Sequence, residues 1–162
     1  MPLLLARIDD RLIHGQVAYG WGRALHPTLF VIVSDALRGD PPRAALYLFA
    51  VPEDARGEVC SVAEALGPEI RDRIERERTI LLFPGTEEPL RLREGGFPLS
   101  AVNLGGLHHA PGREAILPYV FLDALDADRL RRLESLGVRV EAQDLPSNPS
   151  HSLVELLPEP RA

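Results

Sequence analysis

Short runs of apolar residues alternate along the chain with longer segments in which apolar positions recur every three or four residues. The first pattern predicts buried strands and the second predicts amphipathic helices. Residues 29–33, Leu-Phe-Val-Ile-Val, show the strand pattern most clearly, because a continuous apolar run fits a strand buried on both faces of a parallel sheet. Strands are expected at residues 3–8, 29–33, 58–62, 79–83, 101–104 and 138–142, with 118–121 as a further candidate.

Helices are expected between these strands. The first covers residues 12–24 and places four apolar side chains on one face: Leu12, Ile13, Val17 and Trp21. The pair His26-Pro27 ends it, because the residue before a proline is pushed out of the α region. Further helices are expected from Asp40-Pro41-Pro42 to about Phe49, over residues 62–78 with Gly67-Pro68 as a place for a break, and over residues 89–94 and 126–136.

Strands that alternate with helices are typical of an α/β fold with right-handed crossovers. We therefore predict a single-domain, open, mostly parallel twisted sheet with helices on both faces. Residues 138–142 alternate in polarity, which indicates an antiparallel or edge strand near the C-terminus. Residues 1–145 form the expected domain, and residues 146–162, rich in Pro, Ser and Glu, form a C-terminal tail that is expected to fray. Ligands of such sheets bind beyond the carboxyl ends of the strands, so the loops there hold the candidate site.

Composition narrows the class of partner. The 162 residues carry a net charge of −6, which argues against nucleic acid, since affinity for nucleic acid depends on neutralising phosphates. All 18 cationic residues are Arg, so a P-loop lysine and Schiff-base chemistry are excluded. Any bound phosphate must be held by Arg, backbone N–H or hydroxyl groups.

The cysteine count and the hydropathy of the chain predict a cytoplasmic protein. Cys60 is the single cysteine, which fits a reducing compartment. The apolar stretch at residues 2–6 has no basic leader and reaches Arg7 too early for a signal peptide. No apolar run approaches the roughly 18 residues that a membrane span needs.

The densest group of chemically active side chains lies at residues 7–17, Arg-Ile-Asp-Asp-Arg-Leu-Ile-His-Gly-Gln-Val, between the first strand and the first helix. Unpaired N–H groups and the dipole at a helix start favour an anion. A neutral His14 can act as a nucleophile toward phosphorus, and Arg11 can bind phosphate oxygens as a planar fork. Gly15 lets a phosphoryl group approach the backbone.

The same residues allow a plainer interpretation. Asp9 and Asp10 can simply cap the helix, with Arg11 paired to one of them and His14 on the surface. Composition and spacing alone therefore indicate an anion site but no reaction.

The run at residues 7–17, followed by Trp21, closely resembles the opening of the mannose/sorbose-family IIB components of the bacterial phosphoenolpyruvate-dependent sugar phosphotransferase system. Other segments resemble the same family: Ile32-Val33-Ser34-Asp35, Asp40-Pro41, and residues 48–52, 61–65 and 102–108. The resemblance covers about residues 3–145.

The resemblance implies a phosphohistidine carrier that needs no metal and no other cofactor. Its histidine, aligned with His14, accepts a phosphoryl group, usually on Nδ1, from a phosphorylated IIA domain and passes it to a sugar taken up through the membrane components IIC and IID. The arginine aligned with Arg11 assists the transfer. A homo-oligomer is compatible with this role, and peripheral association with the inner face of the membrane through IIC and IID is expected.

A carboxylate beside a phosphate repels it, so the two aspartates need another role. One of them is expected to orient the ring or the loop by accepting a hydrogen bond from the imidazole, from Arg11 or from a helix amide, and we assign this role to Asp10. The other candidates for contact with phosphate or partner are Asp9, Gly15, Gln16, Asp35, Gly105, Gly106 and His108. No metal site is expected at His108-His109, because adjacent residues rarely point to one ion.

Two other functions stay open. A regulatory phosphorelay protein could use His14 to report phosphoenolpyruvate status without transport. A freestanding phosphatase or mutase could form a phosphohistidine intermediate, although those enzymes carry an Arg directly before the His, where this chain has Ile13.

Overall fold

The structure is a computed structural model and describes residues 3–157. One seven-stranded sheet has the order β3-β2-β4-β1-β5-β8-β9, and all its neighbouring pairs are parallel except β8 with β9. This arrangement, with helices on both faces, confirms the predicted fold class. The strands are β1 (Leu3–Asp9), β2 (Leu29–Val33), β3 (Arg56–Cys60), β4 (Thr79–Phe83), β5 (Ala101–Gly106), β8 (Arg139–Ala142) and β9 (His151–Ser152).

The helices pack on the sheet in two layers, each with its own hydrophobic core. Helices α4, α5, α6 and α7 contribute to the core on one face, and η1, α2 and α3 contribute to the core on the other. The bounds are η1 (Gln16–Trp21), α1 (Gly22–Leu25), α2 (Asp35–Arg38), α3 (Pro41–Leu48), α4 (Val62–Leu66), α5 (Pro68–Arg76), α6 (Glu87–Glu94), α7 (Ala124–Ser135) and α8 (Leu153–Leu156).

The burial of strand β2 on both faces explains why its sequence is apolar at every position. Leu29, Val31 and Val33 point into the core under α4 to α7, whereas Phe30 and Ile32 point into the opposite core. All five are buried, and each such side chain contributes about 1.5–3 kcal/mol to stability. Because both faces of the strand are covered, no position tolerates a polar residue.

The first helix begins later than predicted. Leu12 has a left-handed backbone, with φ 56°, so the helix cannot include it. The helical hydrogen bonds begin where the N–H of Ala18 donates to the carbonyl of His14 at 2.8 Å, and the first segment, η1, is a π-helix. The four side chains predicted for its apolar face, Leu12, Ile13, Val17 and Trp21, are nevertheless all buried in one core.

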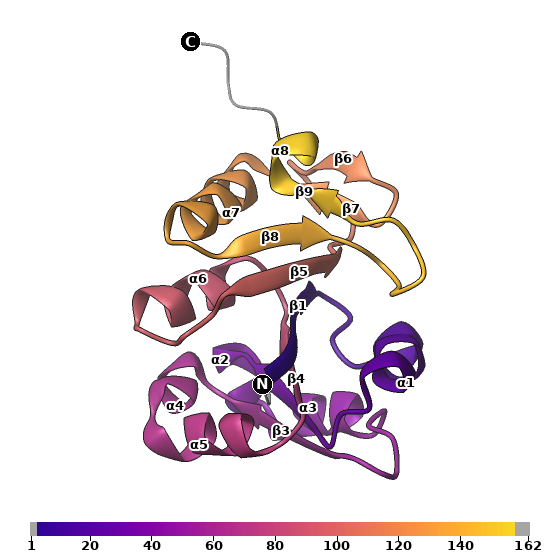
Figure 1. Cartoon of the computed structure of the whole chain (residues 1–162), viewed down its shortest axis with the longest axis vertical. Coiled ribbons are helices and arrows are strands. Elements are labelled where there is room, and N and C mark those ends of the chain that lie inside the picture. The colour runs from indigo at the N-terminus through magenta and orange to yellow at the C-terminus, as the bar shows by residue number, and fades with distance from the viewer. Residues whose placement is uncertain (1–2, 158–162) are drawn as a thin grey trace.

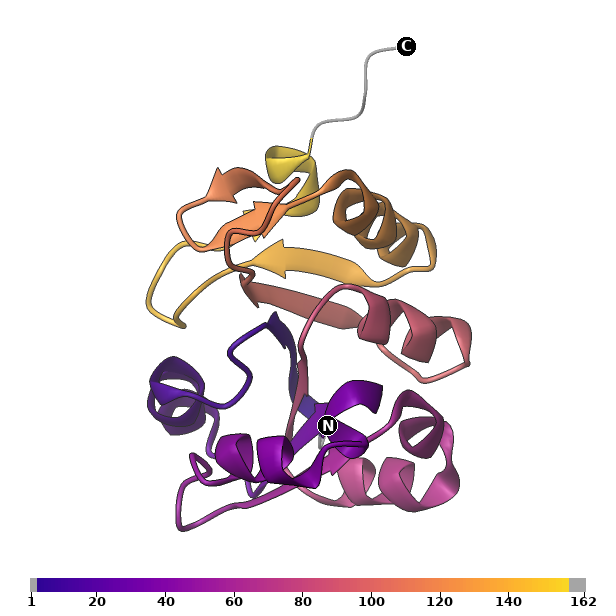
Figure 2. The same cartoon turned by 180° about the vertical axis from the view of Figure 1, so that it is seen from behind.

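The C-terminal part of the chain is more ordered than predicted. Strand β9 pairs with β8, so β8 is not the edge strand, and Leu153 of α8 is buried in the core. The antiparallel hairpin of β6 (Glu114–Leu117) and β7 (Val120–Leu122) overlaps the candidate strand 118–121 only in part. In both views the hairpin and α8 lie beside β8 at one end of the molecule (Figures 1 and 2). Of the predicted tail, residues 158–162 lie outside the described residues.

Candidate functional site

The candidate site lies at the carboxyl ends of β1, β5 and β8. Two loops meet there: residues 10–15, which lead from β1 to η1, and residues 143–150, which lead from β8 to β9 (Figure 1). Strand β1 lies where the order of the strands reverses. The chain passes from β1 to β2 on one side of β1, and later from β4 to β5 on the other side of β1. Ligands of open α/β sheets bind in such a crevice.

A tight turn after β1 brings His14 back to the carboxyl end of that strand. The N–H of Asp10 donates to the carbonyl of Gly106 at 3.0 Å, and the N–H of Leu12 donates to the carbonyl of Asp9 at 2.9 Å. The left-handed conformation of Leu12 costs on the order of 1 kcal/mol, and burial of its side chain in the core compensates for this cost. The chain therefore reverses within five residues.

The imidazole of His14 is bound to a buried carboxylate. Its Nε2 lies 2.9 Å from Oδ2 of Asp9, whose side chain is fully buried, while 18% of the His14 side chain is exposed. Burial alone would raise the pKa of Asp9, but the hydrogen bond from His14 and the charge of Arg7 outweigh it and lower that pKa below its usual value. An ionised carboxylate only accepts hydrogen bonds, so Nε2 donates and the ring carries its proton there. Nδ1 has no hydrogen bond to any residue in the described range.

Behind Asp9 lies a buried guanidinium that the sequence analysis did not identify as part of the site. Arg7, on β1, donates from Nη2 to Asp9 Oδ2 at 3.2 Å and from Nη1 to Asn103 Oδ1 at 2.6 Å. It also donates to the backbone carbonyls of Gln143 at 3.0 Å and Asp144 at 3.1 Å. The signal in the sequence is a single charged residue inside the otherwise apolar run at residues 3–8.

The two glycines at the end of β5 lie against the buried side chains of Arg7 and Asp9. A Cβ at Gly105 would lie 2.0 Å from Cζ of Arg7, and a Cβ at Gly106 would lie 3.2 Å from Oδ1 of Asp9. The glycine pair therefore makes room for the buried ion pair of Arg7 and Asp9, and its assignment to phosphate or partner binding stays a prediction.

Arg11 and Gly15 face the open side of the site. The Arg11 side chain is 41% exposed, and its Nη2 donates to Gln16 Oε1 at 3.0 Å, while its backbone N–H donates to Asp9 Oδ1 at 3.1 Å. Nothing lies within 4 Å of the place that a Cβ of Gly15 would take, and Gly15, at the N-cap position of η1, has no side chain to cap the first turn. Arg11, Gly15 and Gln16 thus lie beside His14 between β1 and η1, and their contact with a phosphate stays a prediction.

The ring of His14 is held by Asp9 and not by Asp10, to which we assigned the orientation of the ring or the loop. Asp10 binds the next loop instead: its Oδ2 accepts from the N–H of His108 at 2.7 Å, and its Oδ1 lies 2.5 Å from Nδ1 of the same residue. Asp10 therefore fixes the loop after β5. The reason is its place one residue beyond the strand, where the side chain points toward that loop rather than into the sheet.

Asp35 lies apart from His14 and joins three helices. Its Oδ1 accepts from the N–H of Val62 at 2.9 Å and its Oδ2 from Arg91 at 2.8 Å. It shares only a surface hollow with Asp10, which His14 does not line. In the structure Asp35 links α2, α4 and α6, and its contact with a phosphate or partner stays a prediction.

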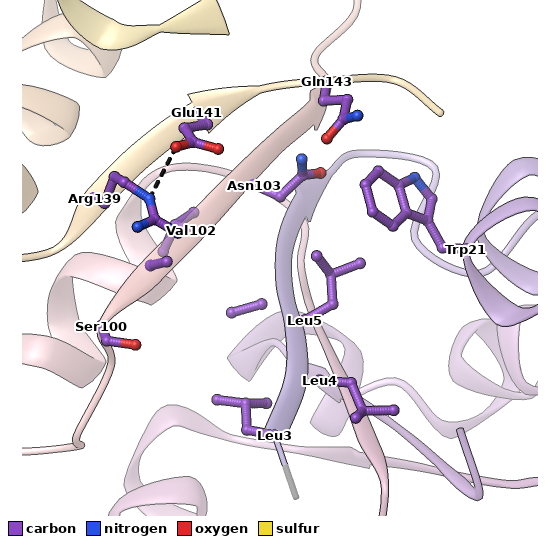
Figure 3. A pocket seen from close by; sticks show the side chains of 12 residues that line it. Leu3, Leu4, Leu5, Trp21, Ser100, Val102, Asn103, Arg139, Glu141 and Gln143 are labelled. Atoms are coloured by element: carbon purple, nitrogen blue, oxygen red, sulfur yellow. Dashed lines mark ion pairs between the residues drawn. The ribbon is translucent and has the colours of Figure 1, made fainter. Parts of the chain in front are cut away.

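A second hollow lies on the open face of the sheet, over β1, β5 and β8. It has a volume of about 230 Å³, and Trp21 stands at its upper end near Asn103 (Figure 3). Arg139 and Glu141, which also line it, form an ion pair with each other at 2.9 Å. Neither His14 nor Arg11 lines this hollow. Within residues 3–157, no group of three or more His, Cys, Asp or Glu side chains is arranged to hold a metal ion.

Comparison with known proteins identifies the family. The family model for the "PTS system sorbose subfamily IIB component" matches residues 3–162. The chain is a member of this family. Like other IIB components of the phosphotransferase system, it belongs to the phosphotransferases of sugar transport.

Individual relatives agree with this assignment. The IIB component is 32% identical over 159 residues to the sorbose-specific EIIB component of Lacticaseibacillus casei, covering 98% of this chain and 97% of that one. It is 31% identical over 157 residues to the mannose-specific EIIAB component of Escherichia coli K12, covering 97% of this chain but 49% of that protein. The crystal structure of the IIB domain of the sorbose permease of Klebsiella pneumoniae superposes with a TM-score of 0.90, at 30% identity and 99% coverage of both chains.

The described part of this IIB component contains no helix that is long and apolar enough to cross a membrane.

The candidate site has three chemical parts: a partly exposed imidazole with one ring nitrogen bound, a guanidinium open to solvent, and a buried carboxylate whose charge Arg7 balances.

Proposed function

We propose that this IIB component is a phosphohistidine carrier that accepts a phosphoryl group on Nδ1 of His14 from a phosphorylated IIA domain and transfers it to a sugar during uptake. The observation that carries the proposal is the hydrogen bond of Nε2 to Asp9, which leaves Nδ1 as the ring nitrogen with a lone pair for attack. IIC and IID are the proposed membrane partners, and cytoplasmic placement against them follows from this role.

In the first step, the lone pair of Nδ1 attacks the phosphorus of the donor phosphohistidine. A new N–P bond forms on His14 as the N–P bond of the donor breaks, and the donor imidazole leaves with the bonding electron pair. Such a displacement has a loose transition state, so the protein mainly positions groups and stabilises charge. The proton on Nε2 stays where it is, next to Asp9.

The surroundings of His14 stabilise the phosphorylated state. The ring gains positive charge when Nδ1 binds phosphorus, and the carboxylate of Asp9 at 2.9 Å stabilises this charge. The repulsion between that carboxylate and the phosphoryl group is reduced because Arg7 pairs with the same Asp9 oxygen. Arg11 is exposed on the same side and can exchange its contact with Gln16 for the phosphoryl oxygens.

In the second step, a sugar hydroxyl attacks the phosphorus from the open side of the site. The N–P bond breaks, its electrons return to Nδ1, and an O–P bond forms as the hydroxyl loses its proton to a base on the sugar-binding partner. The open space at Gly15 gives both the donor and the acceptor room to approach in line.

The test is a phosphotransfer assay with phosphoenolpyruvate, the general phosphotransferase proteins and a cognate IIA, followed by mapping of the acid-labile phosphate. Label on His14 that chases to sugar when membranes with IIC and IID are added supports the proposal. His14→Gln should take up no label, whereas the exposed His151→Gln should match the unchanged chain. Label on another residue would refute the carrier role, label without a chase would favour a regulatory relay, and steady release of phosphate from simple monoesters would favour a phosphatase.

A further inference from the structure

Arg7 is a fully buried charge at the carboxyl end of β1. Moving a guanidinium out of water costs several kcal/mol unless its hydrogen bonds and charge are matched. Burial lowers the pKa of Arg7, and Asp9 opposes this effect. Its donors reach one carboxylate, one side-chain amide and two backbone carbonyls, all of which belong to the surroundings of His14.

The fold is shaped around this side chain. Gly105 leaves the space in which the guanidinium lies, since a Cβ there would be 2.0–2.4 Å from three of its atoms. On the other side, Cζ of Arg7 lies 5.4 Å from the centroid of the Trp21 ring, a cation–π distance. Figure 3 shows Trp21 and Asn103 facing each other across this end of β1. The position is therefore built for a planar cation, which a lysine would not fill.

The same guanidinium connects the site to the loop at residues 143–150. It donates to the carbonyls of Gln143 and Asp144, and Trp21 Nε1 donates to the Asp144 carbonyl at 2.8 Å. Gly20 is packed against Leu145 so closely that a Cβ would lie 2.8 Å from Leu145 Cδ2. The loop is thus bound to the first strand through Arg7 and to η1 through Trp21 and Gly20.

We propose that Arg7 is a positioning residue for phosphoryl transfer: by binding Asp9 from behind, it holds the carboxylate against Nε2 of His14 and so keeps the lone pair of the ring on Nδ1. The proposal rests on the carrier function proposed above but concerns a property that exists before any phosphate is bound. Without the guanidinium, Oδ2 of Asp9 loses its buried donor and only Oδ1 stays bound, to the N–H of Arg11, so the imidazole can carry its proton on either nitrogen.

The test measures the tautomer of His14 and the rate of transfer separately. Long-range ¹H–¹⁵N NMR of the unphosphorylated chain at pH 8 reports which ring nitrogen of His14 carries the proton. The unchanged chain should show the Nε2–H form, while Arg7→Lys should show a mixture of both forms and a fall of about tenfold or more in the rate of phosphorylation. Trp21→Phe, which keeps an aromatic ring but loses the indole N–H that binds Asp144, should give a smaller effect in the same direction.

Arg93→Lys is the matched control. Arg93 also donates to a backbone carbonyl, that of Leu136 at 3.1 Å, and its Nε is also buried without a described partner, but it lies on α6. Because Arg93 is only partly buried and makes a single hydrogen bond, Arg93→Lys should lower the urea midpoint less than Arg7→Lys and leave the tautomer and the rate unchanged. If Arg7→Lys fails to fold, Asn103→Ala, which removes one acceptor of Arg7 at 2.6 Å, gives the same readout.

The outcomes separate this proposal from the carrier function. A pure Nε2–H tautomer in folded Arg7→Lys and in Asn103→Ala overturns the positioning role, even when His14 is phosphorylated. Absence of phosphorylation in the unchanged chain, with the expected shift of tautomer in Arg7→Lys, overturns the carrier function alone. A loss of rate in the Arg93→Lys control equal to that in Arg7→Lys would show that the effect is merely one of stability.

Discussion

Asp9 and His14 lie five residues apart, yet Oδ2 of one and Nε2 of the other are 2.9 Å apart at the end of β1. The left-handed turn at Leu12 makes this contact possible, because it reverses the chain before η1 begins. The relationship resembles that of Asp and His in a Ser-His-Asp triad, where the carboxylate fixes the tautomer and stabilises the charged ring. It distinguishes the two adjacent aspartates, of which only Asp9 reaches the ring.

The first prediction separates these aspartates. Asp9→Asn should lower the rate of phosphorylation of His14 on the order of 10²-fold or more, because the amide can donate to Nε2 and favour the wrong tautomer. Asp10→Asn should have a smaller effect, since Asp10 contacts the loop at His108. The rates are measured by rapid-quench phosphotransfer from a phosphorylated IIA. Asp40→Asn, at the exposed cap of α3, is the control, and a larger effect for Asp10 than for Asp9 would contradict the assignment.

The second prediction concerns Arg11. Arg11→Gln should change the free energy of unfolding by less than about 0.5 kcal/mol, because the side chain is on the surface. It should slow transfer on the order of 10²-fold, the usual cost of losing one donor to a developing charge. Urea unfolding and the transfer assay measure the two effects. Arg76→Gln on α5, which is 80% exposed, should change neither, and an Arg11→Gln chain with the normal rate would exclude Arg11 from the transition state.

The third prediction tests the space that Gly105 provides. Gly105→Ala should destabilise the fold by at least about 1–3 kcal/mol, because its Cβ would overlap the Arg7 guanidinium. Gly39→Ala should stay within about 0.5 kcal/mol, since the nearest atoms to that Cβ lie 3.7 Å away. Urea titrations of both variants provide the comparison. Equal stability of the two would mean that Arg7 moves aside at no cost.

The fourth prediction follows from the lowered pKa of Asp9. A carboxylate whose pKa is lower in the folded state stabilises the fold above its unfolded pKa, near 4, and loses this contribution as the pH falls through the folded value. The difference in unfolding free energy between the unchanged chain and Asp9→Asn should therefore shrink as the pH falls below about 4. Urea unfolding between pH 5 and pH 2, in steps of about half a unit, measures it. A difference that stays constant over this range would show that the pKa of Asp9 is not lowered.

The fold was largely predictable because strands that are buried on both faces are apolar at every position, which is visible in the sequence. Strands 29–33 and 79–83 were predicted with the bounds that β2 and β4 have, since both are covered on both faces and apolar throughout. The hairpin of β6 and β7 was only partly predicted, because its first strand has four residues, none of which is fully buried. The start of η1 was missed because Leu12 adopts its conformation for a tertiary contact, which local propensity does not contain.

The sequence pointed to His14 and to the solvent-facing Arg11 but not to the buried side chains that lie behind them. His14 and Arg11 are close in sequence, so their meeting needs only one turn. Arg7 reaches partners that lie 96 to 137 residues away, and no local pattern encodes such contacts. Two features of the sequence did indicate the position of Arg7. One is a charge within an apolar strand, and the other is the pair Gly105-Gly106 on the strand that pairs with it.

The most direct measurement of the central claim identifies the nitrogen of His14 that carries phosphorus. The ¹⁵N-labelled chain is phosphorylated with phosphoenolpyruvate, the general phosphotransferase proteins and a cognate IIA, and long-range ¹H–¹⁵N NMR then distinguishes the two phosphohistidine isomers. With Nε2 bound to Asp9, phosphorus should appear on Nδ1 of His14 and the Nε2 proton should remain. Phosphorus on Nε2, or on any residue other than His14, would contradict the account.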